Sequence, residues 1–184
     1  MRIAIIYATT EGQTLKIARR AAELCQNAGH EIELLNAVAV PADFIMAPYD
    51  AAILLSSVHV GHYQAAMSTF LNDYKDDLQA IPNAFISVSL SAASTDHDDV
   101  DGLREVTDDF YKQTGFTPLY EHLAAGAFRF TRYDFFKRWA MKLIAAQKGI
   151  DADTSKDLEL TDWPGVEKFV KDFIGGISKS SNAA

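Results

Sequence analysis

The sequence contains a single cysteine, Cys25, among its 184 residues. One cysteine excludes an intramolecular disulfide and a cysteine-based metal cluster, and its place in a helical pattern indicates an inert core thiol. No apolar run reaches the roughly 18 residues of a transmembrane helix. Met1 and Arg2 lead straight into an apolar run, which leaves no room for a signal peptide. We therefore expect a cytoplasmic protein whose contact with a membrane is at most peripheral.

Positive charge is also scarce. Lys and Arg number 17 against 25 Asp and Glu, which gives a net charge of -8 and a pI of about 5.0. Nucleic acid is not an expected partner, because affinity for its phosphates depends on clustered Lys and Arg. A hydrophobic content of 48% allows one packed domain, which we place at residues 1–177, with a flexible tail at 178–184. The oligomeric state stays open, a homo-oligomer included.

Glycine and lysine are scarce in the most informative turn, which lies between the apolar run Ile3–Tyr7 and a helical pattern that starts near Leu15. Its residues are Thr9, Thr10, Glu11, Gly12, Gln13 and Thr14. A single glycine excludes the three-glycine dinucleotide fingerprint, and the missing Gly-Lys-Ser/Thr excludes a P-loop nucleotidase. Hydroxyls at a helix N-terminus suit a terminal phosphate held by neutral donors. The alternative is ordinary helix capping by threonine without a ligand.

Apolar segments alternate with helical patterns along the rest of the chain. Further strands are predicted at 31–36, 50–57, 84–91 and 118–127, and helices between about 13 and 29, from 64 to 78, from 100 to 114 and from 161 or 162 to 174. Gly115 should end the third helix. Asp96, Asp98, Asp99 and Asp101 are interpreted as a solvated helix start and not as a metal site. The pattern predicts an α/β fold with a doubly wound, five-stranded parallel sheet in the order 2-1-3-4-5.

Two further loops end at the same edge of this sheet as the hydroxyl-rich turn. The first comprises Ser57, Val58, His59, Val60, Gly61, His62 and Tyr63, and the second begins with Ser89, Leu90, Ser91 and Ala92. Such carboxyl ends bind ligands in open α/β sheets. His59, His62 and Tyr63 offer flat or polar surfaces for a ring, although His62 and Tyr63 also suit a tight turn. Together the three loops could hold a phosphate and a planar ring.

An insertion separates the fifth strand from the last helix. It spans Phe128–Leu160, or 33 residues, where such a connection usually takes about 2 to 6. Residues 128–148 carry six basic side chains and one acidic one, a local charge of +5. Within them Tyr133–Gln147 has an amphipathic helical pattern with aromatic residues on one stripe. A basic amphipathic helix is typical of contact with an anionic membrane surface or with a partner groove, and packing of this stripe on the domain is the alternative.

The hydroxyl-rich turn resembles the phosphate loop of flavodoxins, which hold FMN, except that Glu11 stands where Thr is usual. Longer stretches resemble the flavodoxin-type, quinone-dependent protoporphyrinogen oxidase family, whose phosphate loop has the pattern Thr, any residue, acidic, Gly, Gln, Thr. The matching segments are 9–14, 61–63, 87–88, 126–130, 132–133, 141–144 and 161–163. The resemblance extends over nearly the whole chain, and Glu11 fits this family.

The resemblance implies that FMN takes six electrons from protoporphyrinogen IX and passes them to menaquinone or ubiquinone at the inner face of the cytoplasmic membrane. It implies no catalytic triad and no metal, because the chemistry takes place on the flavin. Arg129 and Arg132 are the candidates for binding the two substrate propionates, since Arg pairs bidentately with carboxylates. Two alternatives stay open: a flavodoxin-type electron carrier without its own substrate, and an NAD(P)H:quinone reductase. A receiver domain is disfavoured, because paired acids after the first strand are missing.

Overall fold

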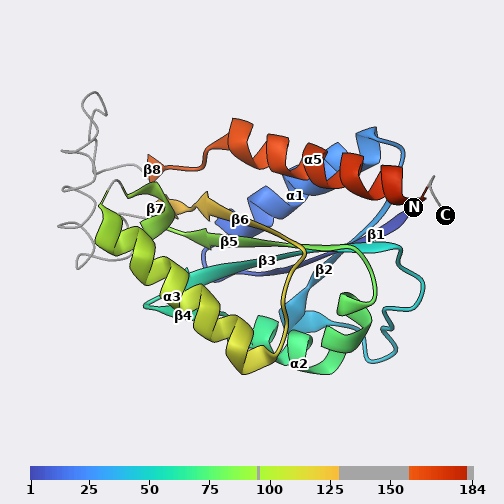
Figure 1. Ribbon diagram of the computed structural model, residues 1–184, viewed down its shortest axis with the longest axis horizontal. Helices are drawn as coiled ribbons and strands as arrows, with labels where there is room; N and C mark the ends of the chain where they lie inside the picture. The colour runs from blue at the N-terminus through green and yellow to red at the C-terminus, as the bar shows by residue number, and fades with distance from the viewer. Residues whose placement is uncertain (95, 129–157, 182–184) are drawn as a thin grey trace.

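The protein is built around one parallel β-sheet with helices on both faces (Figure 1). The computed structural model describes residues 1–94, 96–128 and 158–181. Five parallel strands lie in the order β2-β1-β3-β5-β6, which confirms the predicted order 2-1-3-4-5. They are β1 (Arg2–Ala8), β2 (Glu31–Asn36), β3 (Ala51–His59), β5 (Asn83–Ser89) and β6 (Tyr120–Ala125).

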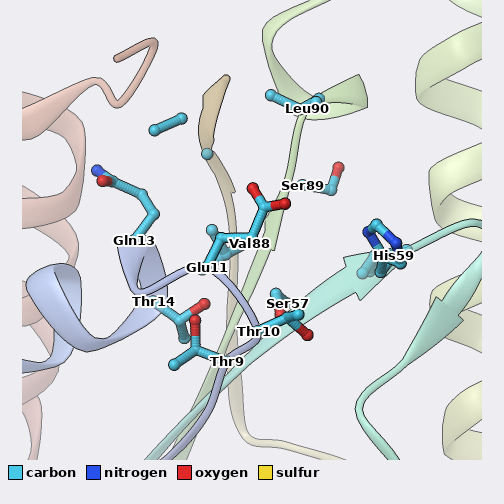
Figure 2. Close-up of a pocket in the computed structure, with 13 residues that line it drawn as sticks. Thr9, Thr10, Glu11, Gln13, Thr14, Ser57, His59, Val88, Ser89 and Leu90 are labelled. Carbon is cyan, nitrogen blue, oxygen red and sulfur yellow. The ribbon is translucent and has the colours of Figure 1, made fainter. Parts of the chain in front are cut away.

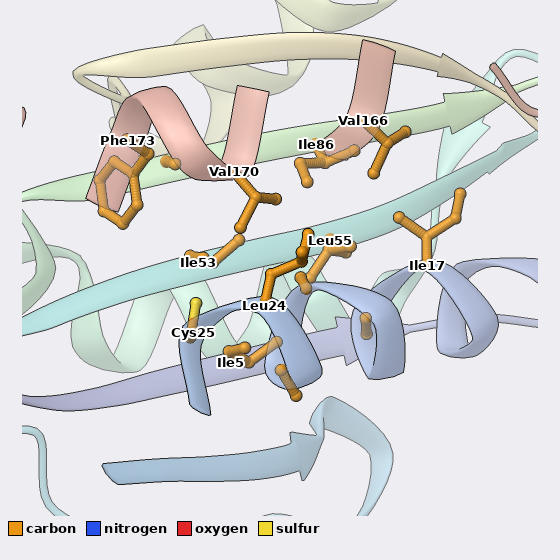
Figure 3. Packing of buried hydrophobic residues seen from close by; sticks show 14 of the residues in the cluster. Ile5, Ile17, Leu24, Cys25, Ile53, Leu55, Ile86, Val166, Val170 and Phe173 are labelled. Atoms are coloured by element: carbon orange, nitrogen blue, oxygen red, sulfur yellow. The ribbon is translucent and has the colours of Figure 1, made fainter. Parts of the chain in front are cut away.

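Helices α1 (Gln13–Asn27) and α5 (Trp163–Ser181) cover one face, and α2 (Ala65–Gln79) and α3 (His97–Thr114) cover the other (Figure 1). Successive residues of a strand point to opposite faces, so Ile5 packs under α1 and α5 while Ile6 packs on the side of α2. Both are fully buried, which explains the continuous apolar strands. Cys25 lies in the hydrophobic core between the sheet and helices α1 and α5 (Figure 3). Burial there raises the pKa of its thiol to about 12. The prediction of an inert core thiol is confirmed.

The third strand extends further than predicted. It continues past Ser57 to His59 and folds back through a two-residue turn into β4 (His62–Tyr63), which pairs with it antiparallel. Val58 and His59 are therefore strand and not loop. In contrast, β5 ends at Ser89, two residues early, because the chain enters the short 3-10 turn η2 (Ser91–Ala93). Another such turn, η1 (Ala37–Ala39), follows β2.

Two helices differ from prediction at their ends. Helix α3 begins three residues early because Asp96 caps it, its carboxylate accepting a 3.1 Å hydrogen bond from the Asp98 amide. Asp98 and Asp99 lie in its first turn and Gly115 ends it, so the interpretation of these acids as a helix start is confirmed. Helix α5 runs to Ser181 and not to 174, because Ile177 is buried in the core. The helix thus includes residues 178–181 of the predicted tail, and 182–184 lie outside the described residues.

The two described ends of the insertion meet at the carboxyl edge of the sheet. After Gly126, β7 (Ala127–Phe128) pairs antiparallel with β8 (Leu158–Glu159), so β6 is shorter than predicted. Figure 1 places β4, β7 and β8 at the same end of the molecule. The helix expected at 133–147, together with Arg129 and Arg132, lies outside the described residues. Among the described helices none has the length and apolarity needed to cross a membrane.

Candidate functional site

A pocket opens at the carboxyl end of β1, β3, β5 and β6 (Figure 2). Most of its lining comes from the three segments that the sequence singled out, which converge here because parallel strands end at one edge. Its lining residues are Thr9, Thr10, Glu11, Gln13, Thr14, Ser57, Val58, His59, Val88, Ser89, Leu90, Gly126 and Ala127. The structure therefore brings the hydroxyl-rich turn and the two neighbouring segments into one site.

The hydroxyl-rich turn leads into α1 through Gly12, whose φ of 90° is readily adopted only by glycine. The Gly12 amide donates a 3.0 Å hydrogen bond to the Thr9 hydroxyl, which closes the turn. In the described structure no side chain caps α1 and its first turn holds no acid. The first amides of a helix have no intrahelical acceptor and carry a partial positive charge. The turn thus presents donors to an anion, and threonine capping of the helix is not observed.

Thr14 supplies the decisive side chain of this turn. The residue is 1% exposed, and its hydroxyl has no hydrogen-bond partner among the described residues. A buried hydroxyl without a partner costs about 1–3 kcal/mol, and native structures rarely leave one. This hydroxyl lies in the first turn of α1 beside the uncapped amides. The combination fits an anionic group that accepts hydrogen bonds from both.

The turn is held from two sides by side-chain amides. On one side the Thr10 hydroxyl donates to Gln64 Oε1 at 3.0 Å, and Gln64 Nε2 donates to the Ser57 hydroxyl at 3.1 Å. This chain links the turn to the start of α2 and the end of β3. On the other side Gln13 Nε2 donates to the Thr161 hydroxyl at 2.8 Å. The turn is therefore fixed relative to two walls of the pocket before any ligand binds.

The hairpin of β3 and β4 divides the predicted ring-binding residues. His59 lines the pocket and is paired across the hairpin with the exposed His62. Tyr63 is 8% exposed, and its hydroxyl donates to the Ser87 hydroxyl at 2.7 Å and lies 2.9 Å from that of Thr107. Burial raises the pKa of this phenol, which stays neutral. Tyr63 thus faces the core and is not among the residues that line the pocket, and its contact with a bound ring stays a prediction.

Other predicted residues lie near the pocket without lining it. Ser89 and Leu90 line it, whereas Ser91 and Ala92 belong to η2, and Val60 and Gly61 form the hairpin turn; none of these last four is among the lining residues. Val88, Gly126 and Ala127 also line the pocket; in the sequence they belong to segments that carry the family resemblance but were not predicted as binding residues. Gly126 could have been found, because a glycine directly after a strand at this edge allows close backbone approach. Its amide donates to the Ser89 carbonyl at 3.0 Å.

The sequence matches a known protein family whose fold agrees with the structure. Residues 4–155 match the family described as a flavodoxin domain. The chain belongs to the flavodoxin-domain family. Among solved flavodoxins, that of Streptococcus pneumoniae covers 96% of the chain and 99% of its own with a TM-score of 0.58 at 15% identity. A mutant flavodoxin of Fusobacterium nucleatum bound to flavin mononucleotide covers 97% and 96% with a TM-score of 0.52 at 16% identity. These similarities establish the fold.

Curated relatives are more similar in sequence. The protoporphyrinogen IX dehydrogenase [quinone] of Escherichia coli K12 is 28% identical over 172 residues, which cover 94% of both chains. The protein of the same name from Leishmania major is 29% identical over 173 residues, which cover 92% of this chain and 73% of that one. The similarity to such dehydrogenases thus extends over more than nine tenths of the chain.

The charges of the pocket fit FMN as the ligand of a flavodoxin-domain protein. Among its described lining residues are one carboxylate, Glu11, and one imidazole, His59, but no Lys or Arg. Figure 2 shows the Glu11 carboxylate turned away from Thr9 and Thr14, toward the side of the pocket where Ser89 lies. The hydroxyl end of the pocket is thus kept clear of this carboxylate. A phosphate monoester can bind there through the Thr14 hydroxyl and the α1 amides.

Proposed function

We propose that this protein is an FMN-dependent oxidoreductase that oxidises protoporphyrinogen IX to protoporphyrin IX and passes the electrons to menaquinone or ubiquinone. The observation that carries the proposal is the similarity over 94% of both chains to a bacterial dehydrogenase of that name. The pocket supports it, because its donors suit the phosphate of FMN. When bound, FMN supplies two-electron redox chemistry that no side chain of the chain provides.

In this proposal the residues of the chain bind and orient. The Thr14 hydroxyl and the first amides of α1 hold the phosphate. Segments 57–59 and 88–90, with Gly126 and Ala127, enclose the remainder of the cofactor. The hydrogen bonds from Thr10 and Gln13 hold the turn in place, so little ordering is needed on binding. A preformed site of this kind favours tight cofactor retention.

The substrate needs cations that the described pocket lacks. Ala127 lines the pocket, and Arg129 follows it by two residues and Arg132 by five. We assign the two propionates of protoporphyrinogen to these arginines, which lie outside the described residues. Replacing both by Gln should raise the KM for protoporphyrinogen and leave FMN retention unchanged. The matched control is Arg104→Gln on the exposed surface of α3, which should change neither.

The deciding experiment is anaerobic turnover of protoporphyrinogen by the FMN-loaded protein with a menaquinone analogue as acceptor. We expect porphyrin fluorescence to rise only when FMN, protein and quinone are all present. An electron carrier would show no such turnover, although its FMN would still exchange electrons with a partner protein. The carboxylate of Glu11 in the pocket lining and the net charge of -8 favour that second candidate. Turnover with NADPH in place of porphyrinogen would instead indicate a quinone reductase.

We further propose that residues 128–148 bring the enzyme to an anionic membrane, where a quinone is available. Their charge of +5 stands against -8 for the whole chain, and anionic lipid attracts such segments. Replacing Lys137, Arg138 and Lys142 by Gln should abolish sedimentation with vesicles that contain phosphatidylglycerol. The control replaces Lys168, Lys171 and Lys179 on α5, which should sediment like the wild type. Equal sedimentation of both variants would contradict the membrane contact.

A further inference from the structure

The turn of the β3–β4 hairpin holds a β-branched residue in an unfavourable backbone conformation. Val60 has a φ of 49°, and of the described residues other than glycine it alone has a positive φ. Left-handed backbone is disfavoured for L-residues and most of all for β-branched ones. Gly61 follows with a φ of 74°, so the two residues form the kind of turn that normally contains Asn-Gly or Gly-Gly. A valine at the first position departs from this preference for Asn or Gly.

The fold around this turn holds the strained conformation in place. Below it, Val58 is paired with Tyr63 and His59 with His62. The buried Tyr63 hydroxyl fastens the returning strand to Ser87 of β5 and Thr107 of α3. An anchored hairpin of this kind leaves the turn little freedom to relax, and such strain persists only where the surroundings determine the backbone.

Packing does not account for the valine. Its side chain is 73% exposed, so it contributes little buried surface to the domain, and glycine or asparagine would form the turn with less strain. The turn directly follows His59, which lines the pocket. The hairpin therefore exposes an apolar side chain to solvent one residue beyond the pocket lining, at a cost to stability.

We propose that Val60 is a specificity-determining contact for the flat, largely apolar redox partner that approaches the pocket. The inference rests on the proposed function, which supplies two partners of that chemistry, a quinone and a porphyrinogen. Contact with either partner removes valine surface from water and so contributes to the binding free energy of that partner. This contribution offsets the free-energy cost of the strained turn. The side chain is a binding contact of the rim and takes no part in proton or electron transfer.

The test compares Val60→Asn with Val60→Ile in the FMN-loaded protein. Asparagine tolerates the left-handed conformation and removes the apolar surface, whereas isoleucine keeps both strain and surface. We expect Val60→Asn to raise the melting temperature by roughly 2 °C or more as strain is relieved. It should also raise the KM for one partner by about fivefold, through lost apolar contact. The partner affected, quinone or porphyrinogen, identifies the one that Val60 contacts, and Val60→Ile should resemble the wild type.

The matched control is Val38→Asn in η1, where a valine is 72% exposed without a positive φ. It should change neither the melting temperature nor either KM. A stabilised Val60→Asn protein with both KM values unchanged would overturn the inference, as would the absence of stabilisation. If the wild type shows no turnover, the proposed function fails. Equilibrium dialysis of menadione and of protoporphyrin IX against wild type and Val60→Asn then still decides, since equal affinities for both compounds refute the contact and weaker binding of either one by the variant supports it.

Discussion

The side-chain amide of Gln13 donates a 2.8 Å hydrogen bond to the hydroxyl of Thr161, 148 residues further along the chain. The Thr161 hydroxyl donates in turn to the Ala125 carbonyl at 2.8 Å. One hydroxyl thus joins the first residue of α1, the segment that enters α5 and the last residue of β6. Because Gly126 and Ala127 follow directly and line the pocket, this relay fixes one pocket wall relative to the hydroxyl-rich turn.

Replacing Thr161 by Val should disrupt the relay. The Gln13 amide and the Ala125 carbonyl each lose a partner, and we expect the free energy of unfolding to fall by about 1–2 kcal/mol. Urea denaturation measures this change. Thr161→Ser retains the hydroxyl and should recover most of the stability. If Val and Ser variants were equally stable, the relay would contribute nothing beyond packing.

Thr14→Val should have opposite effects on the free and the FMN-bound protein. In the free protein the buried hydroxyl has no partner among the described residues, so an apolar replacement of the same shape should leave stability unchanged or raise it. In the complex the same change removes a donor to the phosphate and should weaken FMN binding by about 1.5–3 kcal/mol, as for a hydrogen bond to a charged group. Thermal unfolding with and without FMN, together with FMN titration, measures both signs.

Thr9→Val provides the contrast. The Thr9 hydroxyl already accepts the Gly12 amide at 3.0 Å, so its loss should destabilise the free protein by about 0.5–1.5 kcal/mol. FMN binding should weaken only as far as the turn loses its shape. If Thr9→Val and Thr14→Val changed free-protein stability in the same direction, the assignment of separate roles would be wrong.

Much of this architecture could be predicted from sequence, because it depends on local patterns. The fully apolar run at Ile3–Tyr7 identifies a strand buried on both faces, and Gly12 and Gly115 mark helix ends by their conformational freedom. The hydroxyl-rich turn can also be predicted, because its residues are contiguous in the sequence. The end of α5 was missed because Ile177 continues the helix through packing on the sheet, a tertiary effect beyond the reach of local composition.

Other features of the site depend on contacts between residues that are far apart in the sequence. Tyr63 looked like a ligand residue because its neighbours in sequence, His59 and Gly61, lie at the sheet edge. Only the register of the hairpin decides that it points inward to Ser87 and Thr107, which are 24 and 44 residues away along the chain. Likewise Val88 and Ala127 line the pocket, although the family resemblance of their segments does not indicate which of their residues bind a ligand.

Tyr63→Phe should therefore reduce stability more than cofactor binding. The substitution keeps the ring against Phe85 and Phe110 but leaves buried hydroxyls of Ser87 and Thr107 without that partner, at a cost of about 1–2 kcal/mol. The control Tyr74→Phe loses a hydrogen bond to the Phe44 carbonyl at a half-buried position and should cost about 0.5–1 kcal/mol. Urea unfolding of both proteins measures the difference, and equal losses would contradict the buried network.

The carboxyl group of Glu159 in β8 should make the contact between β8 and α1 sensitive to acid. Burial opposes ionisation of its carboxyl, but hydrogen bonds from Lys16 and from the Trp163 indole at 2.7 Å outweigh it and lower its pKa below the ordinary value of 4.5. A lowered folded-state pKa stabilises the fold fully above the ordinary value, and this stability is lost as the pH falls through the folded-state pKa. The difference in unfolding free energy between wild type and Glu159→Gln should therefore be larger at neutral pH than at about pH 3.5.

Lys16→Met tests whether this dependence comes from the contact between α1 and β8. Without the ammonium group the carboxylate loses its charged partner, and the extra acid sensitivity of the wild type should shrink. At neutral pH, Glu159→Gln should lower the free energy of unfolding less in the Lys16→Met protein than in the wild type. The reason is that the effects of substitutions at two residues in contact are not additive. Urea unfolding of the four proteins at both pH values measures the coupling. A coupling of the same size at both values would show that the carboxylate charge plays no part in holding β8 on α1.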